Sequence, residues 1–352
     1  MAVRNITIEE YWQHACGNMP LLDVRTPAEY HHGHIPGAWN LPLFSNEERA
    51  DIGTIYKKQS PRLAFLKGLE YVGPQMRHLV EAASKIATAG QIAVHCWRGG
   101  QRSNSLAWLL GTAGLEVQVI KGGYKAYRQF LHQQFESFSS SLLIVGGSTG
   151  SGKTAMLHAL AEQGEQIIDL ERLARHKGSA FGALGEPGQP TVEQFENDLY
   201  EAIRQLDPTK RIWLENESKA IGKVYIPDPL WQKICAAPLF DVKLPLEARI
   251  KRLLDEYACF SIEDLKASFK KIEKRLGGQH LKAALEALDA GKLDEAAKIA
   301  LQYYDKAYQH HTISRRLPAL IIPVEPDSLK PSDMAQWLKK VADYSLKQIQ
   351  LT

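Results

Sequence analysis

Apolar residues in this chain occur in two patterns that alternate along the sequence. One is a short continuous run, typical of a buried strand, and the other repeats every three to four residues, as on one face of a helix. The short runs lie at residues 21–24, 91–94, 117–120, 142–145, 166–170, 211–215, 239–244 and 320–324. Helical spacing is found at 103–115, 124–135 and 155–163. Strands that alternate with helices predict parallel sheets, and therefore an α/β fold.

Capping signals predict the starts of two further helices near the N-terminus. Residues 7–10 and 26–29 each form a capping box, and Pro27 occupies the first helical position of the second one. The segment at 46–62 is polar and shows neither apolar pattern. We interpret it either as a disordered loop or as an insert that faces a substrate, and the sequence does not choose between the two.

A serine-rich stretch predicts where one domain ends and the next begins. We expect a first domain over residues 1–136, a linker at 137–141 and a second domain over 142–352. A chain of 352 residues is long enough for two domains that each bury a core. Residues from about 250 to 315 carry helical patterns without a strand, so we expect a helical insertion in the second domain.

One segment of that insertion is amphipathic and basic. Its apolar positions, at helical spacing, are Ile262, Leu265, Phe269, Ile272 and Leu276. Its other face carries Lys266, Lys270, Lys271, Lys274 and Arg275. Charge of nearly one sign favours a nucleic-acid phosphate backbone, although a solvated face is the commoner meaning of such a pattern. Tyr303, Tyr304 and Tyr308 can stack on bases or simply belong to the core.

The composition limits which binding partners and which cellular compartment fit this protein. The net charge is only +3, so a nucleic acid would have to meet a local basic patch. The four cysteines, Cys16, Cys96, Cys235 and Cys259, form no CxxC pair, which suits a reducing cytoplasm. No apolar run approaches the ~18 residues of a membrane span, and the charged N-terminal segment is unlike a signal peptide. We therefore expect a cytoplasmic protein without a membrane partner.

The richest chemistry of the first domain surrounds Cys96. This residue follows the run at 91–94, on a glycine-containing loop that leads into a helix and is expected to bind an anion with its backbone N–H groups. Arg98 and Arg102 add positive charge, a setting that favours the thiolate. Five residues lie between Cys96 and Arg102, enough to surround a tetrahedral oxyanion that Arg102 clamps. A phosphatase cysteine and a sulfur or selenium carrier both fit, and a buried structural cysteine is the alternative.

The second domain opens with a phosphate-binding motif. Residues 147–154 read G-S-T-G-S-G-K-T between a predicted strand and a predicted helix, which is the context that this motif requires. Backbone N–H groups of such a loop bind a diphosphate, Lys153 reaches its outer oxygens, and Thr154 can hold Mg²⁺. The diphosphate-binding residues that we predict are Gly147, Gly150, Ser151, Gly152, Lys153 and Thr154.

Acidic residues end two further predicted strands of this domain. Asp169 lies in the run at 166–170, where it can orient Mg²⁺, act as a base or equally serve as the N-cap of the next helix. Glu215 ends the run at 211–215, and an acidic strand end that faces such a loop usually serves the metal. We therefore count Asp169 with Cys96, Arg98 and Arg102 as catalytic candidates, and Thr154 and Glu215 as metal ligands.

Several motifs of the first domain resemble the rhodanese (sulfurtransferase) family. They are residues 23–30 (DVRTPAEY), 33–38 (GHIPGA) and 121–124 (KGGY). The resemblance implies that Asp23 and Arg25 support the active loop, whereas by themselves they can be an exposed ion pair. The loop after Cys96 is one residue longer than is usual for rhodaneses and resembles that of related phosphatases. This difference favours a donor that carries a phosphate group.

Taken with the phosphate-binding domain, the resemblance extends over essentially the full length to the tRNA 2-selenouridine synthase family. It is carried by residues 95–103, 147–154, 169–171, 176–182, 215–218 and 303–305. It implies an α/β fold with an N-terminal rhodanese-like domain and a C-terminal P-loop NTPase-like domain. It also implies a transferase that replaces the sulfur of wobble 2-thiouridine in tRNA by selenium from selenophosphate, with geranylation from geranyl diphosphate as a linked step.

Other functions fit some of the same residues. A cysteine phosphatase or a sulfurtransferase fused to a nucleotide kinase would use both motifs, although the rhodanese-like flanks argue against the phosphatase. A non-catalytic tRNA-binding module would not need Cys96 or Lys153. Within the family interpretation, Cys96 either carries selenium covalently or only holds the donor, and the sequence leaves this open.

Overall fold

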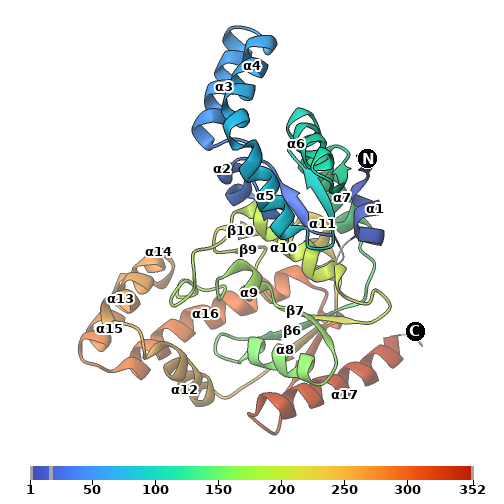
Figure 1. Ribbon diagram of the computed structural model, residues 1–352. Helices are drawn as coiled ribbons and strands as arrows, with labels where there is room; N and C mark the ends of the chain where they lie inside the picture. Colours follow the sequence, from blue (N-terminus) through green and yellow to red (C-terminus); the bar gives the residue numbers. More distant parts are fainter. Residues whose placement is uncertain (1–2, 16–18, 350–352) are drawn as a thin grey trace. The chain divides into compact units, whose positions relative to one another are not determined.

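The computed structural model describes residues 3–15 and 19–349, and it divides the chain into two compact units at residues 136 and 137 (Figure 1). Each unit contains one five-stranded sheet in which every pairing is parallel, as the alternation of strands and helices predicts. The α/β fold class is therefore confirmed. Cys16 lies outside the described residues.

The sheet of the first unit has the order β1-β5-β4-β2-β3. These strands are β1 (Arg4–Ile6), β5 (Glu116–Ile120), β4 (Gln91–His95), β2 (Leu21–Asp23) and β3 (Trp39–Asn40). Apolar residues of β2, β4 and β5 pack with α5 (Met76–Ile86) and α6 (Gln101–Thr112) into one core. Strand β4 is therefore central, and the chain that leaves its carboxyl end starts from a rigid position.

Short helices complete the first unit. They are α1 (Ile8–Glu10), a π-helical turn at Tyr11–Ala15, α2 (Pro27–His32), α3 (Asn46–Lys58), α4 (Pro61–Val72), a 3₁₀ turn at Gly73–Gln75, and α7 (Gly123–Ser137). Both predicted capping boxes are present, at the starts of α1 and α2. In each box a threonine side chain accepts the N–H of the glutamate three residues on.

The structure contradicts the interpretation of residues 46–62 as a disordered loop, whereas an insert that faces a substrate stays a prediction. Most of this segment is the regular helix α3, whose N-cap Ser45 accepts the N–H of Glu48. Helix α3 packs along α4, and Gly68 of α4 leaves room for Phe44 and Ile52. None of the residues of α3 is fully buried. Because the helix packs mainly on α4, it needs no continuous apolar stripe, and the periodic signal is absent.

The sheet of the second unit has the order β12-β11-β6-β8-β7. These strands are β12 (Ile321–Val324), β11 (Leu239–Val242), β6 (Leu142–Gly147), β8 (Ile212–Glu215) and β7 (Gln166–Ile168). An antiparallel pair, β9 (Ala220–Ile221) and β10 (Val224–Tyr225), lies outside this sheet. Strand β6 is central and leads directly into the 147–154 loop, so this loop also starts from a rigid position.

Helices pack against the second sheet and form an apolar core together with its strands. Helices α8 (Lys153–Glu162) and α17 (Pro331–Ile349) pack on each other and share one core with β6, β8 and β11. The remaining helices of this part are α9 (Leu170–Ala174), α10 (Val192–Arg204) and α11 (Asp228–Ala236). No helix within the described residues is long and apolar enough to cross a membrane.

Between β11 and β12 the chain forms a helical insertion with its own apolar core. Its helices are α12 (Leu246–Tyr257), α13 (Ile262–Lys271), α14 (Glu273–Leu276), α15 (Gly278–Asp289) and α16 (Leu293–Arg315), followed by a 3₁₀ turn at Pro318–Leu320 (Figure 1). The basic segment is not one helix, because the chain breaks between α13 and α14 at Ile272. Its predicted apolar residues lie in the core, with Ile262 only partly buried.

Candidate functional site

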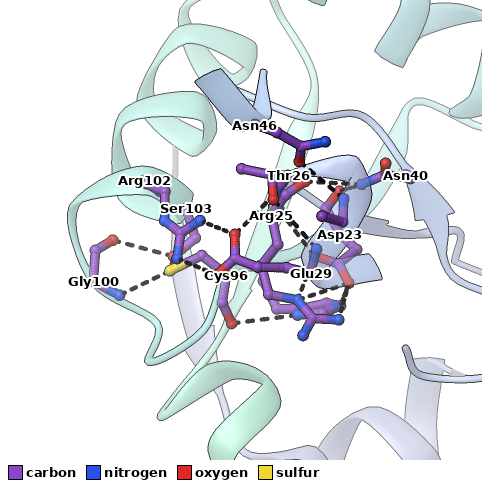
Figure 2. Close-up of polar contacts among 12 residues, drawn as sticks. Asp23, Arg25, Thr26, Glu29, Asn40, Asn46, Cys96, Gly100, Arg102 and Ser103 are labelled. Atoms are coloured by element: carbon purple, nitrogen blue, oxygen red, sulfur yellow. Dashed lines mark hydrogen bonds and ion pairs between the residues drawn. The ribbon is translucent and has the colours of Figure 1, made fainter. Parts of the chain in front are cut away.

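Cys96 lies directly after β4, at the start of the loop that leads into α6. Its side chain is buried, with 3% of the residue exposed. The backbone N–H of Gly100 donates to its sulfur over 3.3 Å, and the Ser103 hydroxyl lies at the same distance (Figure 2). The loop therefore does turn N–H groups inward, as its glycines predict.

Two opposing effects set the pKa of the Cys96 thiol. Burial raises this pKa, but hydrogen bonds from the Ser103 hydroxyl and from the backbone N–H groups of Ser103, Arg98 and Gly100 lower it. The hydrogen bonds outweigh burial, so the pKa lies below its ordinary value. Cys96 is thus buried and also favoured as a thiolate, a combination typical of a reactive rather than a structural cysteine.

The 121–124 motif holds this loop from the other side. The N–H groups of Tyr124 and Lys125 donate to the carbonyl oxygens of Cys96 and Trp97, each over 2.9 Å. Gly123 has a φ of +58°, and a Cβ there would collide with the carbonyl oxygen of Cys96. A glycine is therefore needed at this position for the two loops to pack.

The two arginines near Cys96 differ in their surroundings. Arg98 is exposed. Both terminal nitrogens of Arg102 bind the carboxylate of Glu29, at 2.7 and 3.2 Å (Figure 2). Burial raises the pKa of Glu29, but the hydrogen bond and the charge of Arg102, together with the N–H of Thr26 and the charge of Arg25, outweigh burial, so that the pKa is below its usual value. In this structure the Arg102 guanidinium thus contacts Glu29, and the role of Arg102 in binding an oxyanion stays a prediction.

Asp23 and Arg25 form a buried ion pair, so their interpretation as an exposed pair is wrong. The shortest contact is 2.5 Å, and both side chains are almost fully inaccessible. The Arg25 guanidinium also donates to the carbonyl of Gly33 and lies 3.8 Å from the centre of the Tyr124 ring. Burial raises the pKa of Asp23, but the nearby His95 and Arg25 lower it below its ordinary value. This pair links β2, the 33–38 segment and the loop after β5.

The second candidate site is the loop between β6 and α8, residues 147–154. Gly150 and Gly152 have φ values of +80° and +78°, which is why glycine is needed there. The Lys153 amine reaches back to the carbonyl oxygen of Gly147 over 3.3 Å. This curled loop, followed by a helix N-terminus, is the arrangement that binds diphosphates.

Residues far along the chain hold this loop in place. Arg252 of α12 donates to the carbonyl of Ser151, and Arg249 donates to that of Thr149. Arg249 is in turn fixed by a two-pronged ion pair with Asp305 of α16. The Tyr308 hydroxyl accepts the N–H of Gly147 and donates to Asp241, each over 2.7 Å. A Cβ on Gly152 would collide with Arg252.

Carboxylates gather beside this loop at the ends of β7 and β8. Asp169 is the N-cap of α9 and also contacts His158 over 2.6 Å, so its interpretation as a cap is confirmed. Thr154 donates its hydroxyl hydrogen to Glu171, and the N–H of Glu171 donates to Glu215. Burial, followed by the charges of Asp169 and Glu171, raises the pKa of Glu215 well above its usual value. Burial and the charge of Glu171 raise the pKa of Glu217 to about 8.

The donors around Thr154 suit a hard cation. One carboxylate oxygen of Glu215, Oε2, is buried and has no hydrogen-bond partner within the described residues. Mg²⁺ prefers oxygen ligands and is commonly held by one or two side chains together with substrate phosphates. The described residues contain no cluster of three or more His, Cys, Asp or Glu side chains that could hold a metal by themselves. The oxygen donors present therefore fit a metal that arrives with a phosphate ligand.

A polar cleft with about 1230 Å³ of empty space opens over the 147–154 loop. Besides that loop, it is lined by Glu171 and Glu217 and by basic side chains from the insertion and its neighbours. The basic ones are Lys177, Arg252, Arg275, His311 and Arg315. Tyr303, Tyr304 and Tyr308 also line this cleft, so all three predicted tyrosines contribute to it, whereas of the basic residues predicted on the insertion only Arg275 does.

The predicted basic face of the insertion is only partly free. Lys270, Lys271, Lys274 and Arg275 are exposed, and Arg275 reaches the polar cleft. Lys266 instead forms ion pairs with Asp289 of α15 and with Glu263, and only 18% of its side chain is exposed. It belongs to the packing between α13 and α15, so its assignment to a free basic face is wrong.

Sequence reasoning overlooked several residues that shape the two sites. Glu29 was noted only as part of a capping box, and Arg249 and Arg252 are separated from the loop they hold by about a hundred residues of chain. Glu171 stands beside Asp169 in the same acidic strand end, and that proximity could have identified it. Tyr308 and Asp305 carried a signal only as part of a tyrosine-rich segment.

Comparison with known proteins gives results for both units. A family model for the tRNA 2-selenouridine synthase AAA domain matches residues 140–322, and a model for the rhodanese-like domain matches residues 7–130. The first of these matches covers more than half of the chain.

Similar proteins that bear the name tRNA 2-selenouridine synthase come from several bacteria. The protein from Sulfurovum sp. (strain NBC37-1) is 36% identical over 82% of this chain and 84% of its own length. The protein from Bdellovibrio bacteriovorus is 34% identical over 88% of this chain and 93% of its own length. The protein from Shewanella loihica is 35% identical over 96% of this chain and 97% of its own length. The similarity thus extends across both units.

Proposed function

The chain belongs to the tRNA 2-selenouridine synthase family, and from that premise we propose that it modifies tRNA by converting wobble 2-thiouridine into 2-selenouridine. The selenium donor in this proposal is selenophosphate. A linked step first alkylates the sulfur with geranyl diphosphate. The observation that carries the proposal is the Cys96 sulfur, which is buried at the end of β4 yet hydrogen-bonded as a thiolate requires.

The first step joins the geranyl group to sulfur. The sulfur of 2-thiouridine forms a bond to C1 of the geranyl group as the C1–O bond breaks, and diphosphate leaves with the electron pair. Donors that stabilise the departing charge accelerate such a reaction. The backbone N–H groups of the 147–154 loop and the Lys153 amine supply this stabilisation. Thr154 and Glu215 would hold Mg²⁺, which when bound neutralises part of the charge on the diphosphate.

The second step exchanges the alkylated sulfur for selenium. The Se–P bond of selenophosphate breaks, and water supplies the oxygen of the phosphate product. Selenium bonds to C2 of the base, and the C2–S bond breaks to release geranyl thiol. In this proposal the loop after Cys96 binds the tetrahedral donor with its N–H groups, and the thiolate of Cys96 orients the selenium for attack on C2.

The transfer reaction is tested by analysing tRNA nucleosides after incubation with the purified full-length protein, selenophosphate and geranyl diphosphate. Wild-type protein should convert 2-thiouridine into 2-selenouridine, and Cys96→Ser should not. Cys259→Ser is the matched control because this cysteine is exposed and distant in sequence from both loops, and it should leave conversion unchanged. Selenouridine formation by Cys96→Ser at the wild-type rate would contradict the proposal.

A further inference from the structure

A second cavity lies inside the helical insertion, and its walls are apolar. This cavity, the apolar chamber, has about 620 Å³ of empty space, part of it open to solvent. Leucine, alanine and phenylalanine side chains from α12, α13, α15 and α16 form most of its lining. Leu265, Phe269 and Leu288, which form its inner wall, are buried in the core of the insertion. Among the described residues, none with a charged side chain lines the chamber.

The apolar chamber adjoins the polar cleft over the 147–154 loop. The residues that line both are Thr149, Ser179, Leu253, Tyr257 and Tyr304. Thr149 belongs to the phosphate-binding loop itself, so the chamber borders the loop that would bind a diphosphate. The Tyr304 hydroxyl accepts the N–H of Ala180, which ties one polar group of this shared wall to the protein. Beyond this wall the lining is purely hydrocarbon or aromatic.

This combination of a phosphate site and an apolar chamber fits an amphiphilic diphosphate better than a nucleotide. A purine base and a ribose carry several donors and acceptors, and burying them without partners costs free energy. The chamber offers such partners only at its mouth, through Thr149, Ser179 and the two tyrosines. A hydrocarbon chain gains free energy from the same surroundings in proportion to the surface that it buries.

We propose that the apolar chamber holds the hydrocarbon chain of the diphosphate ester whose head group binds the 147–154 loop, and that the residues of its wall set the preferred chain length. The occupant is an isoprenoid diphosphate with a chain of about ten carbons, and this inference rests on the proposed function. Ala296, Ala297 and Ala300 lie on successive turns of α16 along the chamber. Their small side chains leave the space that a chain needs.

Binding measurements on the full-length protein test this assignment. The probes are inorganic diphosphate, dimethylallyl diphosphate, geranyl diphosphate, farnesyl diphosphate and ATP, each measured by calorimetry in the presence of Mg²⁺. Each additional buried carbon strengthens binding by about fourfold at most. Geranyl diphosphate should therefore bind roughly 100- to 1,000-fold more tightly than dimethylallyl diphosphate, which has five carbons fewer. ATP should bind no more tightly than inorganic diphosphate.

Two variants change the size of the chamber in opposite directions. Ala297 lines the chamber but is only partly buried, so Ala297→Phe should fill the space without displacing the core. It should weaken the binding of geranyl diphosphate at least tenfold and leave the binding of inorganic diphosphate unchanged. Leu293→Ala enlarges the chamber and should strengthen the binding of farnesyl diphosphate relative to that of geranyl diphosphate. Ala267→Phe is the matched control, because Ala267 is exposed on α13 and does not line the chamber.

The possible outcomes separate this inference from the proposed function. If inorganic diphosphate binds and Lys153→Ala abolishes that binding, but the hydrocarbon chain adds no affinity, the chamber assignment is overturned and the phosphate site stands. Equal weakening of both ligands by Ala297→Phe would likewise overturn it. If no diphosphate binds at all, the phosphate-site step of the proposed function fails together with the inference. Thermal unfolding of each variant shows whether lost binding reflects a lost fold. If Ala297→Phe does not fold, the affinities of Leu293→Ala for farnesyl and geranyl diphosphate decide whether the chamber assignment stands.

Discussion

At the scale of single residues, the reactive groups depend on neighbours that a sequence motif does not contain. Cys96 and Lys153 could be identified from sequence because each lies in a contiguous motif whose spacing has a chemical reason. Arg102 could be identified too, but its partner Glu29 lies 73 residues away in sequence, on another helix. Such pairings depend on how the strands are ordered in the sheet, which local patterns do not determine.

The thiol of Cys96 gives the first prediction at this scale. Ser103→Ala removes a hydrogen bond that lowers the pKa of the thiol, so the pKa should rise by about one unit. The check is the pH midpoint of iodoacetamide labelling of the peptide that contains Cys96, followed by mass spectrometry. In the wild type this midpoint should lie below the value of about 8.5 for a free thiol.

Ser105→Ala serves as the control for this measurement, because Ser105 is exposed on the same helix. Its midpoint should equal that of the wild type. A wild-type midpoint at or above the free value would contradict the argument that hydrogen bonds outweigh burial.

The buried pair of Asp23 and Arg25 gives the second prediction. Asp23→Asn leaves the Arg25 guanidinium buried without its counter-charge, and the first unit should lose about 3–5 kcal/mol of stability. Hydrogen exchange of the β2 and β4 amides in the whole protein measures this loss. The folded-state pKa of Asp23 is below its unfolded value of 3.8, so its charge stabilises the fold above that pH. The difference between variant and wild type should shrink as the pH falls through the folded-state pKa.

A surface pair provides the contrast. Glu81→Gln breaks the exposed pair with Arg77 and should change protection by less than about 1 kcal/mol. Equal effects of the two substitutions would mean that burial of the Asp23–Arg25 pair does not determine how much the pair contributes to stability.

At the scale of elements, the apolar runs predicted all five strands of the second sheet and the three inner strands of the first, because a strand buried on both faces must be apolar along its length. The edge strands β1 and β3 were missed, because they are short and mostly not buried. The helices were less predictable. Helix α3 packs mainly on α4 and has no apolar stripe, and α17 packs on α8 from the far end of the chain. The basic segment was expected to be one helix, yet its break at Ile272 and the pairing of Lys266 with α15 depend on tertiary packing.

The exposed part of the basic segment gives the prediction at this scale. Replacing Lys270, Lys271 and Lys274 by glutamine should weaken binding to all tRNAs alike, because phosphate contacts position the RNA without reading bases. The dependence of log Kd on log salt should fall by roughly one unit per lost contact. Fluorescence titrations at several salt concentrations measure both. Thermal stability should change little, since exposed charges contribute ~0–1 kcal/mol each.

The matched control is the triple glutamine replacement of Lys282 on α15, Lys292 at the N-cap of α16 and Lys298 on α16, all exposed and paired with acidic neighbours. It removes the same charge from the same insertion and should leave the salt dependence nearly unchanged. If both triple variants bind tRNA equally, the α13–α14 face is simply a solvated surface.

At the scale of the whole molecule, the two units repeat one design. In each, a central parallel strand ends in a glycine-containing loop that leads into a helix: β4 precedes Cys96, and β6 precedes the 147–154 loop. Ligands of open parallel sheets bind at the carboxyl ends of their strands, so each unit presents its chemistry where the fold allows it. This repetition could be predicted from sequence, because both loops follow apolar runs. The chamber in the insertion could not, since it depends on how consecutive helices pack against one another and on Thr149, Ser179 and Phe181 from outside the insertion.

This division of chemistry predicts that the two steps can be separated by single substitutions. Cys96→Ser should still geranylate 2-thiouridine, because the diphosphate site lies on the other unit, and geranylated tRNA should accumulate when selenophosphate and geranyl diphosphate are both supplied. Lys153→Ala should produce neither geranylated nor selenated nucleoside from 2-thiouridine. Given tRNA that is already geranylated, however, it should complete the selenium step, because the hydrogen bonds around the Cys96 sulfur come from the first unit alone. Nucleoside mass spectrometry over a time course distinguishes these products. Failure of Lys153→Ala on the geranylated substrate would mean that the phosphate-binding loop also serves the second step.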